Sequence, residues 1–238
     1  MQPRYLSASV ISGWPTIGDH WSRTVRPTSS LKAAALLTCF SPSSGPFWFM
    51  DVSKAVNVSH FQSNLARVRT EVARSKEPFI KEHFQKYDYP DLPPVWKTLE
   101  VVSLGTLSKL IGNFKDGNTK NLVANDFRIP QFLVLDSWLE SLTSLRNYIA
   151  HHARIWNRRF PQKPEMLRRS CYPWISISPG QPFKLYSILC CMVYWLNAID
   201  EGNTFVADFN ALLMKHPSVN PSSMGSTASW EREPLWQY

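Results

Sequence analysis

The stretch from Ser144 to Arg159 carries the side chains of this chain that are best suited to chemistry. It holds two histidines, four arginines and two asparagines within sixteen residues. An imidazole can accept or donate a proton near neutral pH, and a guanidinium makes charge-assisted, bidentate contacts to phosphate oxygens. These residue types in one short run therefore predict proton transfer at a phosphate group.

A helix is able to position these side chains, because the run contains neither Gly nor Pro and nothing in it forbids a helix. The apolar spacing predicts one long helix from Pro130 to about Asn157, as one rod or two pieces. On such a helix Asn147, His151, Arg154 and Arg158 form an i, i+4, i+7, i+11 row. His152 would project about 100° away from His151, towards the apolar half, where a hydrogen-bonded structural role is favoured. The apolar stripe consists of Leu135, Trp138, Leu139, Leu142, Leu145 and Ile149.

Composition favours a helical globular protein with a substantial core. The 238 residues are 44% hydrophobic and include only 9 glycines, fewer than a sandwich or barrel usually needs. The net charge is +8, and the segment from Leu145 to Arg169 sets seven Lys and Arg against the single acid Glu165. This local excess predicts a polyanionic partner, with a solvated basic face as the alternative.

Several classes of protein are disfavoured. The four cysteines include no CxxC pair, and Cys190 and Cys191 lie in an apolar run, so we expect buried thiols in a reducing compartment and no metal site. No run is long enough for a membrane span, and we expect a cytoplasmic protein. Glycine fingerprints for nucleotide cofactors are absent, so no cofactor is expected. No zinc-finger or basic-zipper pattern points to DNA.

The remaining elements follow from periodicity and from turn residues. Residues 1–44 are rich in Ser, Pro and Trp and are expected to be poorly ordered, with one short helix at Leu31–Phe40. A basic loop is marked by Pro161, Pro164 and Pro173. The other expected helices are Ser59–Arg74, Glu77–Tyr87, Val95–Val102, a short one between Gly105 and Gly112, Asn118–Asn125, a helix from after Pro182 to about Asp200, and Asn203–Lys215.

The run from Leu145 to Arg158 closely resembles the signature of the Abi-like family (AbiD/AbiF type) of phage abortive-infection proteins. That family belongs to the HEPN superfamily, whose R-x4-6-H motif matches Arg146 and His151. The resemblance covers about Gly45 to Tyr238. Its further segments are Arg74–Ile80 with Lys86-Tyr87, Leu92–Trp96, Ser103–Ser108, Ser137–Leu142, Met224-Gly225, Trp230-Glu231 and Pro234–Trp236.

The resemblance implies an all-α, HEPN-like helical bundle over residues 45–238, after a divergent or truncated segment at residues 1–44. It implies a metal-independent endoribonuclease in which the RNA 2′-hydroxyl is the nucleophile. We assign proton transfer to His151, phosphate stabilisation to Arg146, and orientation of the histidine or the phosphate to Asn147. Flanking RNA contacts are expected from Arg154, Asn157, Arg158 and Arg159. Because such sites are built from two facing motifs, a homodimer is implied, and a regulatory RNA is a further partner to test.

Three alternatives stay open. His151 could be a surface histidine at a helix interface, with the arginines as salt-bridge donors. The chain could be a non-catalytic RNA-binding or scaffold module, or an inactive truncated remnant. Trp138 and Trp156 are expected to be core or dimer-interface aromatics rather than platforms for base stacking.

Overall fold

The computed structural model describes residues 45–199 and 202–237. The expected disorder of residues 1–44 and the expected helix Leu31–Phe40 lie outside the described residues. Within the described ranges the regular elements are all helices, and the only β feature is an isolated bridge between Ala55 and Phe114. The all-α prediction is therefore confirmed. The described residues fall into two compact units, which meet in sequence between Asp126 and Phe127.

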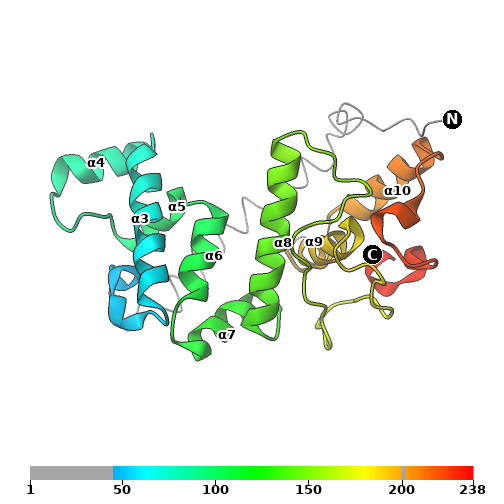
Figure 1. Ribbon diagram of the computed structural model, residues 1–238, viewed down its shortest axis with the longest axis horizontal. Helices are drawn as coiled ribbons and strands as arrows, with labels where there is room; N and C mark the ends of the chain where they lie inside the picture. The colour runs from blue at the N-terminus through cyan, green and yellow to red at the C-terminus, as the bar shows by residue number, and fades with distance from the viewer. Residues whose placement is uncertain (1–44, 200–201, 238) are drawn as a thin grey trace. The chain divides into compact units, whose positions relative to one another are not determined.

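The N-terminal unit, residues 45–126 here, is built around α3 (Figure 1). Helix α3, Val58–Arg74, buries Phe61, Leu65, Val68 and Val72, which recur at helical spacing on one face. The Asn57 side chain caps this helix by accepting the His60 N–H at 2.9 Å. The other elements are η1 (Trp48–Met50), η2 (Val52–Lys54), α4 (Pro78–Lys86), α5 (Val95–Val101), α6 (Leu104–Gly112) and α7 (Gly117–Asp126).

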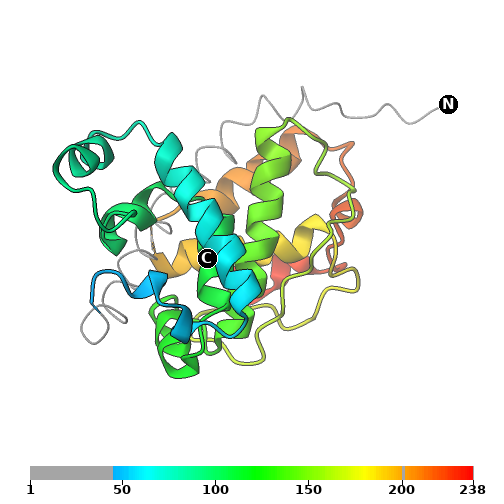
Figure 2. The same cartoon turned by 60° about the vertical axis from the view of Figure 1, so that its left-hand side comes forward.

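Helices α3 and α6 pack side by side and antiparallel (Figure 1), and α3 lies in front of α6 in the turned view of Figure 2. Three polar contacts fix this register, because they join the start of α3 to the end of α6 and the end of α3 to the start of α6. They run from Asn113 Nδ2 to the Asn57 carbonyl (2.8 Å), from Asn64 Nδ2 to the Lys109 carbonyl (3.1 Å), and from the Ser103 N–H to Glu71 Oε2 (2.5 Å).

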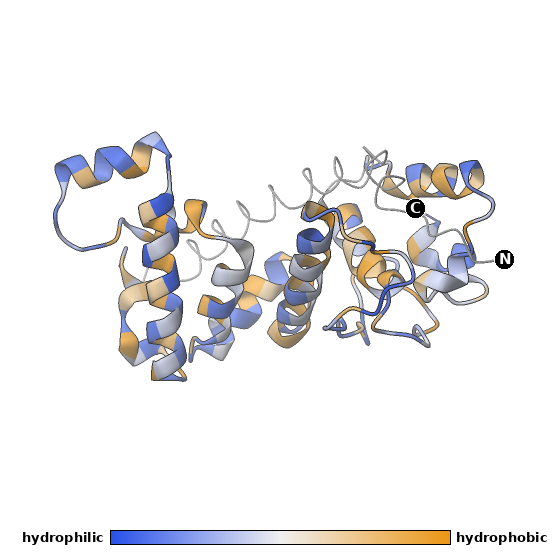
Figure 3. Ribbon diagram, turned by 45° about the horizontal axis from the view of Figure 1, so that its top comes forward, coloured by the Kyte–Doolittle hydropathy of each residue, from blue (hydrophilic) through white to orange (hydrophobic). Residues whose placement is uncertain are grey.

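The C-terminal unit, residues 127–237 here, has α9 at its centre. Every residue of α9 from Leu185 to Asn197 is buried, and the helix is largely orange in Figure 3, where α3 shows both colours. A helix that is apolar on all sides must be covered on all sides. The elements that pack on it are α8 (Phe132–Ala150), α10 (Phe205–Lys215) and η5 (Pro234–Trp236), and η3 (Pro221–Met224) and η4 (Trp230–Arg232) lie between the last two in sequence.

An aromatic cluster ties the long segment 151–184 to α8 and α9. Trp138, fully buried as expected for a core aromatic, stacks on Trp174 with ring centroids 5.5 Å apart, and both rings contact Tyr194 edge-on. The indole N–H of Trp138 donates to the Glu165 carbonyl at 2.6 Å. The segment contains no helix, so the predicted proline-marked loop is confirmed, and side chains rather than a backbone ladder hold it in place.

The helix bounds agree closely with the sequence-based expectations, with one exception at the end of α8. Helix α9, Leu185–Ile199, and helix α10, Phe205–Lys215, correspond to the two apolar helices expected after Pro182. In the part of the chain that is described, no helix is long and apolar enough to cross a membrane.

Candidate functional site

Helix α8 ends at Ala150, and the expected continuation to Asn157 is wrong. His151 is the C-cap, and His152 adopts a left-handed backbone with φ of 51°. Two backbone hydrogen bonds close the turn, from the His152 N–H to the Ile149 carbonyl (3.0 Å) and from the Ala153 N–H to the Tyr148 carbonyl (2.8 Å). This is a Schellman motif, in which the left-handed position is usually occupied by glycine. The end of α8 could not be predicted from the sequence, because a histidine and not a glycine occupies the left-handed position.

The early end of α8 divides the predicted row of four residues. Asn147 and His151 keep their helical relation, since the His151 N–H donates to the Asn147 carbonyl at 3.0 Å. Arg154 and Arg158 lie beyond the helix, so their predicted places on its face are wrong. His152 is exposed at the turn, which contradicts the expectation that it faces the apolar core.

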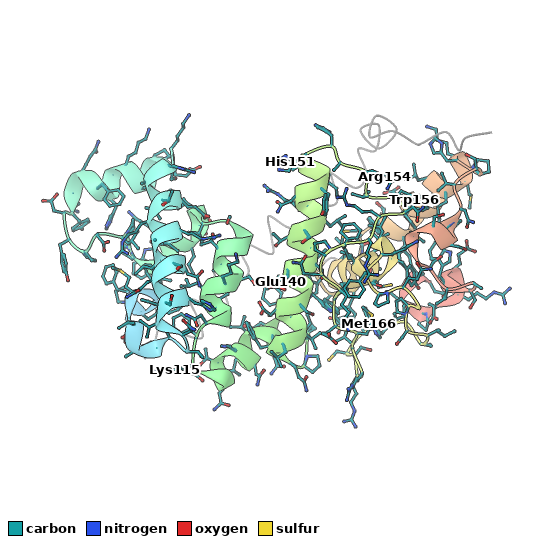
Figure 4. The ribbon with its side chains drawn as sticks, in the orientation of Figure 1. Lys115, Glu140, His151, Arg154, Trp156 and Met166 are labelled. Carbon is teal, nitrogen blue, oxygen red and sulfur yellow. The ribbon has the colours of Figure 1, made fainter. Side chains whose placement is uncertain are left out.

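The three residues expected to be catalytic lie on the last turn of α8 and are all exposed. Arg146 Nη1 donates to Asn147 Oδ1 at 3.1 Å, which draws the guanidinium towards the Asn147 side of the helix. Figure 4 shows His151 at the end of α8, with Arg154 and Trp156 on the loop that follows. A guanidinium, an amide and an imidazole on one uncovered turn are able to contact a phosphodiester from solvent.

Arg158 returns to α8 through the loop and not through the helix. Its guanidinium carbon lies 3.8 Å from the centroid of the Tyr148 ring, and its Nη1 donates to the Arg154 carbonyl at 3.2 Å. A cation over an aromatic face is attracted by the quadrupole of the ring. Phe160 also packs edge-on against the Tyr148 ring, with centroids 5.6 Å apart. The positive charge of Arg158 therefore stays beside the last turn of α8.

Asn157 and Arg159 attach the start of the loop to the segment before α9. Asn157, with φ of 51°, accepts a hydrogen bond from Lys184 Nζ at 2.9 Å. The Arg159 guanidinium lies 4.1 Å from the Phe183 ring centroid. Lys184 and Phe183 could not be predicted as part of the site, because nothing in the sequence pattern indicates contacts between residues more than twenty positions apart.

Positive charge around this turn is not neutralised by an ion pair with any described residue. Within residues 45–199 and 202–237, none of the four arginines of the run forms an ion pair. Glu165, the only acid of the basic segment, faces Lys163 at 3.5 Å. The expected salt-bridge role of these arginines therefore has no carboxylate partner in the described ranges. No group of three His, Cys, Asp or Glu side chains there is placed to hold a metal ion.

The model of the family described as Abi-like protein matches residues 30–157. The match covers more than half of the chain and includes the whole turn that carries Arg146, Asn147 and His151. It starts fifteen residues before Gly45, where the resemblance was expected to begin. No curated protein and no solved structure matches the chain.

Proposed function

This chain belongs to the Abi-like protein family, and we propose that it acts in phage defence by abortive infection as a metal-independent endoribonuclease. The observation that supports this proposal best is the exposed turn of Arg146, Asn147 and His151 at the end of α8, beside arginines that lack ion-pair partners in the described ranges. RNA is the polyanion that brings its own nucleophile to such a site.

The proposed reaction forms a bond between the 2′-oxygen and phosphorus and breaks the bond from phosphorus to the 5′-oxygen. One imidazole accepts the proton of the 2′-hydroxyl, and a second imidazolium gives a proton to the leaving 5′-oxygen. The products are a 2′,3′-cyclic phosphate and a 5′-hydroxyl end. Arg146 stabilises the extra negative charge on the phosphorane oxygens, and Asn147 holds the Arg146 guanidinium.

The second imidazole is proposed to come from a second copy of the turn, because the left-handed backbone of His152 directs its side chain away from the helical position of His151. We propose a homodimer whose two-fold axis passes near the ends of the two α8 helices. Leu133, with 77% of its surface exposed, lies eighteen residues before His151, which is five helical turns and thus the same side of α8. An exposed leucine in line with the site is compatible with a contact along this side.

The test is cleavage of a labelled single-stranded RNA by purified full-length protein in EDTA. We expect the wild type to release fragments with 2′,3′-cyclic phosphate ends. His151→Ala removes the proton-transfer group and should lower the rate by at least about a hundredfold. Arg146→Gln should lower it by a similar factor, because one charge-stabilising donor is lost.

The matched control is His152→Ala, one residue away and also exposed. Because His152 follows the left-handed turn, we expect its substitution to leave the cleavage rate within about threefold of wild type, well below the effect of losing a general acid or base. Cleavage that survives in His151→Ala, or that is lost equally in both variants, would rule out the assignment. Sedimentation of the same samples measures whether the protein is a dimer.

One observation favours a non-catalytic alternative. Asn157, Arg158 and Arg159 are engaged with Lys184, Tyr148 and Phe183 rather than projecting from a continuous helix. An RNA-binding or scaffold module would use this surface for affinity alone. In that case the wild type binds RNA without cutting it, and Arg146→Gln weakens binding. A regulatory RNA bound at the same surface stays a prediction.

A further inference from the structure

A concave, basic site separate from the exposed turn of α8 lies in the N-terminal unit, where the first turns of α3 face the last turns of α6. The pocket has a volume of about 400 Å³. His60, Ser63 and Arg67 line it from α3 at i, i+3 and i+7 spacing, which places them on one face of that helix. Lys109 and Asn113 line it from the end of α6. The proposed RNA cleavage does not use any of these residues.

Four side chains that line the pocket make no polar contact with the described residues. The side chains of His60, Ser63, Arg67 and Lys109 have no hydrogen bond or ion pair in the part of the chain that the structure describes. The side chains of His60, Arg67 and Lys109 are exposed to solvent at the mouth of the pocket. None of the residues that line it is a carboxylate. Two cationic side chains and one imidazole thus line one concavity.

Acceptors at the same place are already occupied. The Lys109 carbonyl receives Asn64 Nδ2 at 3.1 Å and the Asn113 N–H at 3.2 Å. The Gly112 carbonyl receives Lys120 Nζ at 2.8 Å, and Asn113 Oδ1 receives the Asn57 N–H at 3.0 Å. The carbonyls that end a helix would otherwise repel an anion. With these oxygens engaged, the pocket offers donors to a ligand and few acceptors.

We propose that this pocket between α3 and α6 binds a phosphate group, held by Arg67 and Lys109 and hydrogen-bonded by Ser63 and His60. Arginine and lysine with a neighbouring hydroxyl are the usual partners of a phosphate oxyanion. The volume lies at the lower end of the range for small-molecule sites, which suits a nucleotide or one step of a strand. The phosphate can come from an RNA backbone or from a free mononucleotide.

The experiment measures binding by the full chain carrying His151→Ala, so that RNA is not consumed. One arm uses a labelled single-stranded RNA of twelve nucleotides, and the other uses AMP in calorimetry. The pocket variant is Arg67→Gln with Lys109→Gln. The matched control is Lys76→Gln with Lys81→Gln, which removes the same charge from exposed positions of the same unit.

If the phosphate belongs to an RNA backbone, we expect the pocket variant to bind RNA about tenfold more weakly than the parent. The slope of log K against log salt concentration should decrease in magnitude by about 1.4, because two phosphate contacts are lost. For a mononucleotide source, AMP binding is lost in the pocket variant while RNA affinity changes little. The control pair should stay within about twofold of the parent in both arms. Equal losses in the pocket and control variants, or no loss in either arm, would overturn the proposal.

A neutral variant tests the pocket without changing charge. Ser63→Tyr places a ring into the concavity from an exposed position of α3, so folding should be retained and can be checked by thermal melting. We expect it to reproduce the loss seen with the charge variant, and unchanged binding in both arms would contradict the proposal. RNA cleavage is measured separately with protein that retains His151. Phosphate binding at the pocket and RNA cleavage at the α8 turn can therefore be disproved independently of each other.

Discussion

At the residue scale, adjacent histidines in this chain are separated by backbone conformation. His151 has φ of −95° and ends α8, whereas His152 has φ of 51° and begins the loop. A left-handed residue sends its side chain in a direction that no helical position offers. The different directions of the two histidine side chains are therefore set by the Schellman hydrogen bonds of the turn, and not by helical spacing.

This conformation makes a stability prediction. His152→Gly should raise the free energy of unfolding by roughly 0.5–1 kcal/mol, because relief of the left-handed strain exceeds the entropy gained by the unfolded chain. The same substitution at His151, where φ is negative, should lower it by roughly 0.5–1 kcal/mol. Urea unfolding of both variants measures the contrast. Destabilisation of equal size in the two variants would show that the turn is not formed as described.

At the element scale, α4 depends on one buried histidine. His83 is 5% exposed, its Nε2 has no hydrogen-bond partner among the described residues, and its ring packs on Phe84 and Tyr87. Burial, and secondarily the charge of Lys97, lowers the pKa of His83 below the ordinary value for histidine. The folded unit therefore favours the neutral imidazole.

The sign of the resulting pH dependence follows from proton linkage. Below about pH 6.5, His83 binds a proton in the unfolded chain, whereas burial keeps it neutral in the folded chain. The free energy of unfolding therefore falls as the pH falls. His83→Phe removes this proton uptake. We expect the loss of unfolding free energy between pH 7 and pH 5 to be smaller in the variant, with a slope difference of at most about 1.4 kcal/mol per pH unit. Denaturant titrations at several pH values measure it, and parallel curves would contradict the role of His83.

Most elements could be predicted because their determinants are local. The start of α3 is encoded by Asn57 and by the apolar spacing from Phe61, and Pro78 marks the first turn of α4. The end of α8 could not be predicted in this way. Ile155 would fall on the apolar side of α8 if the helix continued, and it is 1% exposed although the helix has ended, so its burial is compatible with either chain path.

The same limit applies to the candidate site. Arg146, Asn147 and His151 could be named because their relation lies within one turn and a local motif. The return of Arg158 onto Tyr148, and the contact of Lys184 with Asn157, depend on the path of the loop. That path is set by the stacking of Trp138 on Trp174 and by contacts of the loop with α9, which are long-range in sequence. The spacing of apolar residues at 3.6 positions per turn does not predict such contacts.

At the scale of the whole molecule, basic charge and apolar content are segregated along the chain. The arginines without an ion pair among the described residues occupy the last turn of α8 and the loop after it, while α9 supplies an apolar centre to the C-terminal unit. Cys190 and Cys191 lie at this centre and are fully buried. Burial raises the pKa of Cys190 to about 12 and raises the pKa of Cys191 as well. Cys171, on the proline-marked loop, is exposed.

These thiols report whether the C-terminal unit is folded. In the native protein at pH 8, iodoacetamide should alkylate Cys171 and leave Cys190 and Cys191 unmodified, because a buried neutral thiol is both inaccessible and unreactive. Reaching Cys190 requires α9 to separate from Trp236 of η5 and from the elements packed around it, so modification should appear only at denaturant concentrations that unfold the unit. Peptide mapping by mass spectrometry identifies the modified residues, and Cys171→Ser provides a background with no exposed thiol among the described residues. Rapid modification of Cys190 or Cys191 in that variant without denaturant would mean that α9 is not the closed centre of the unit.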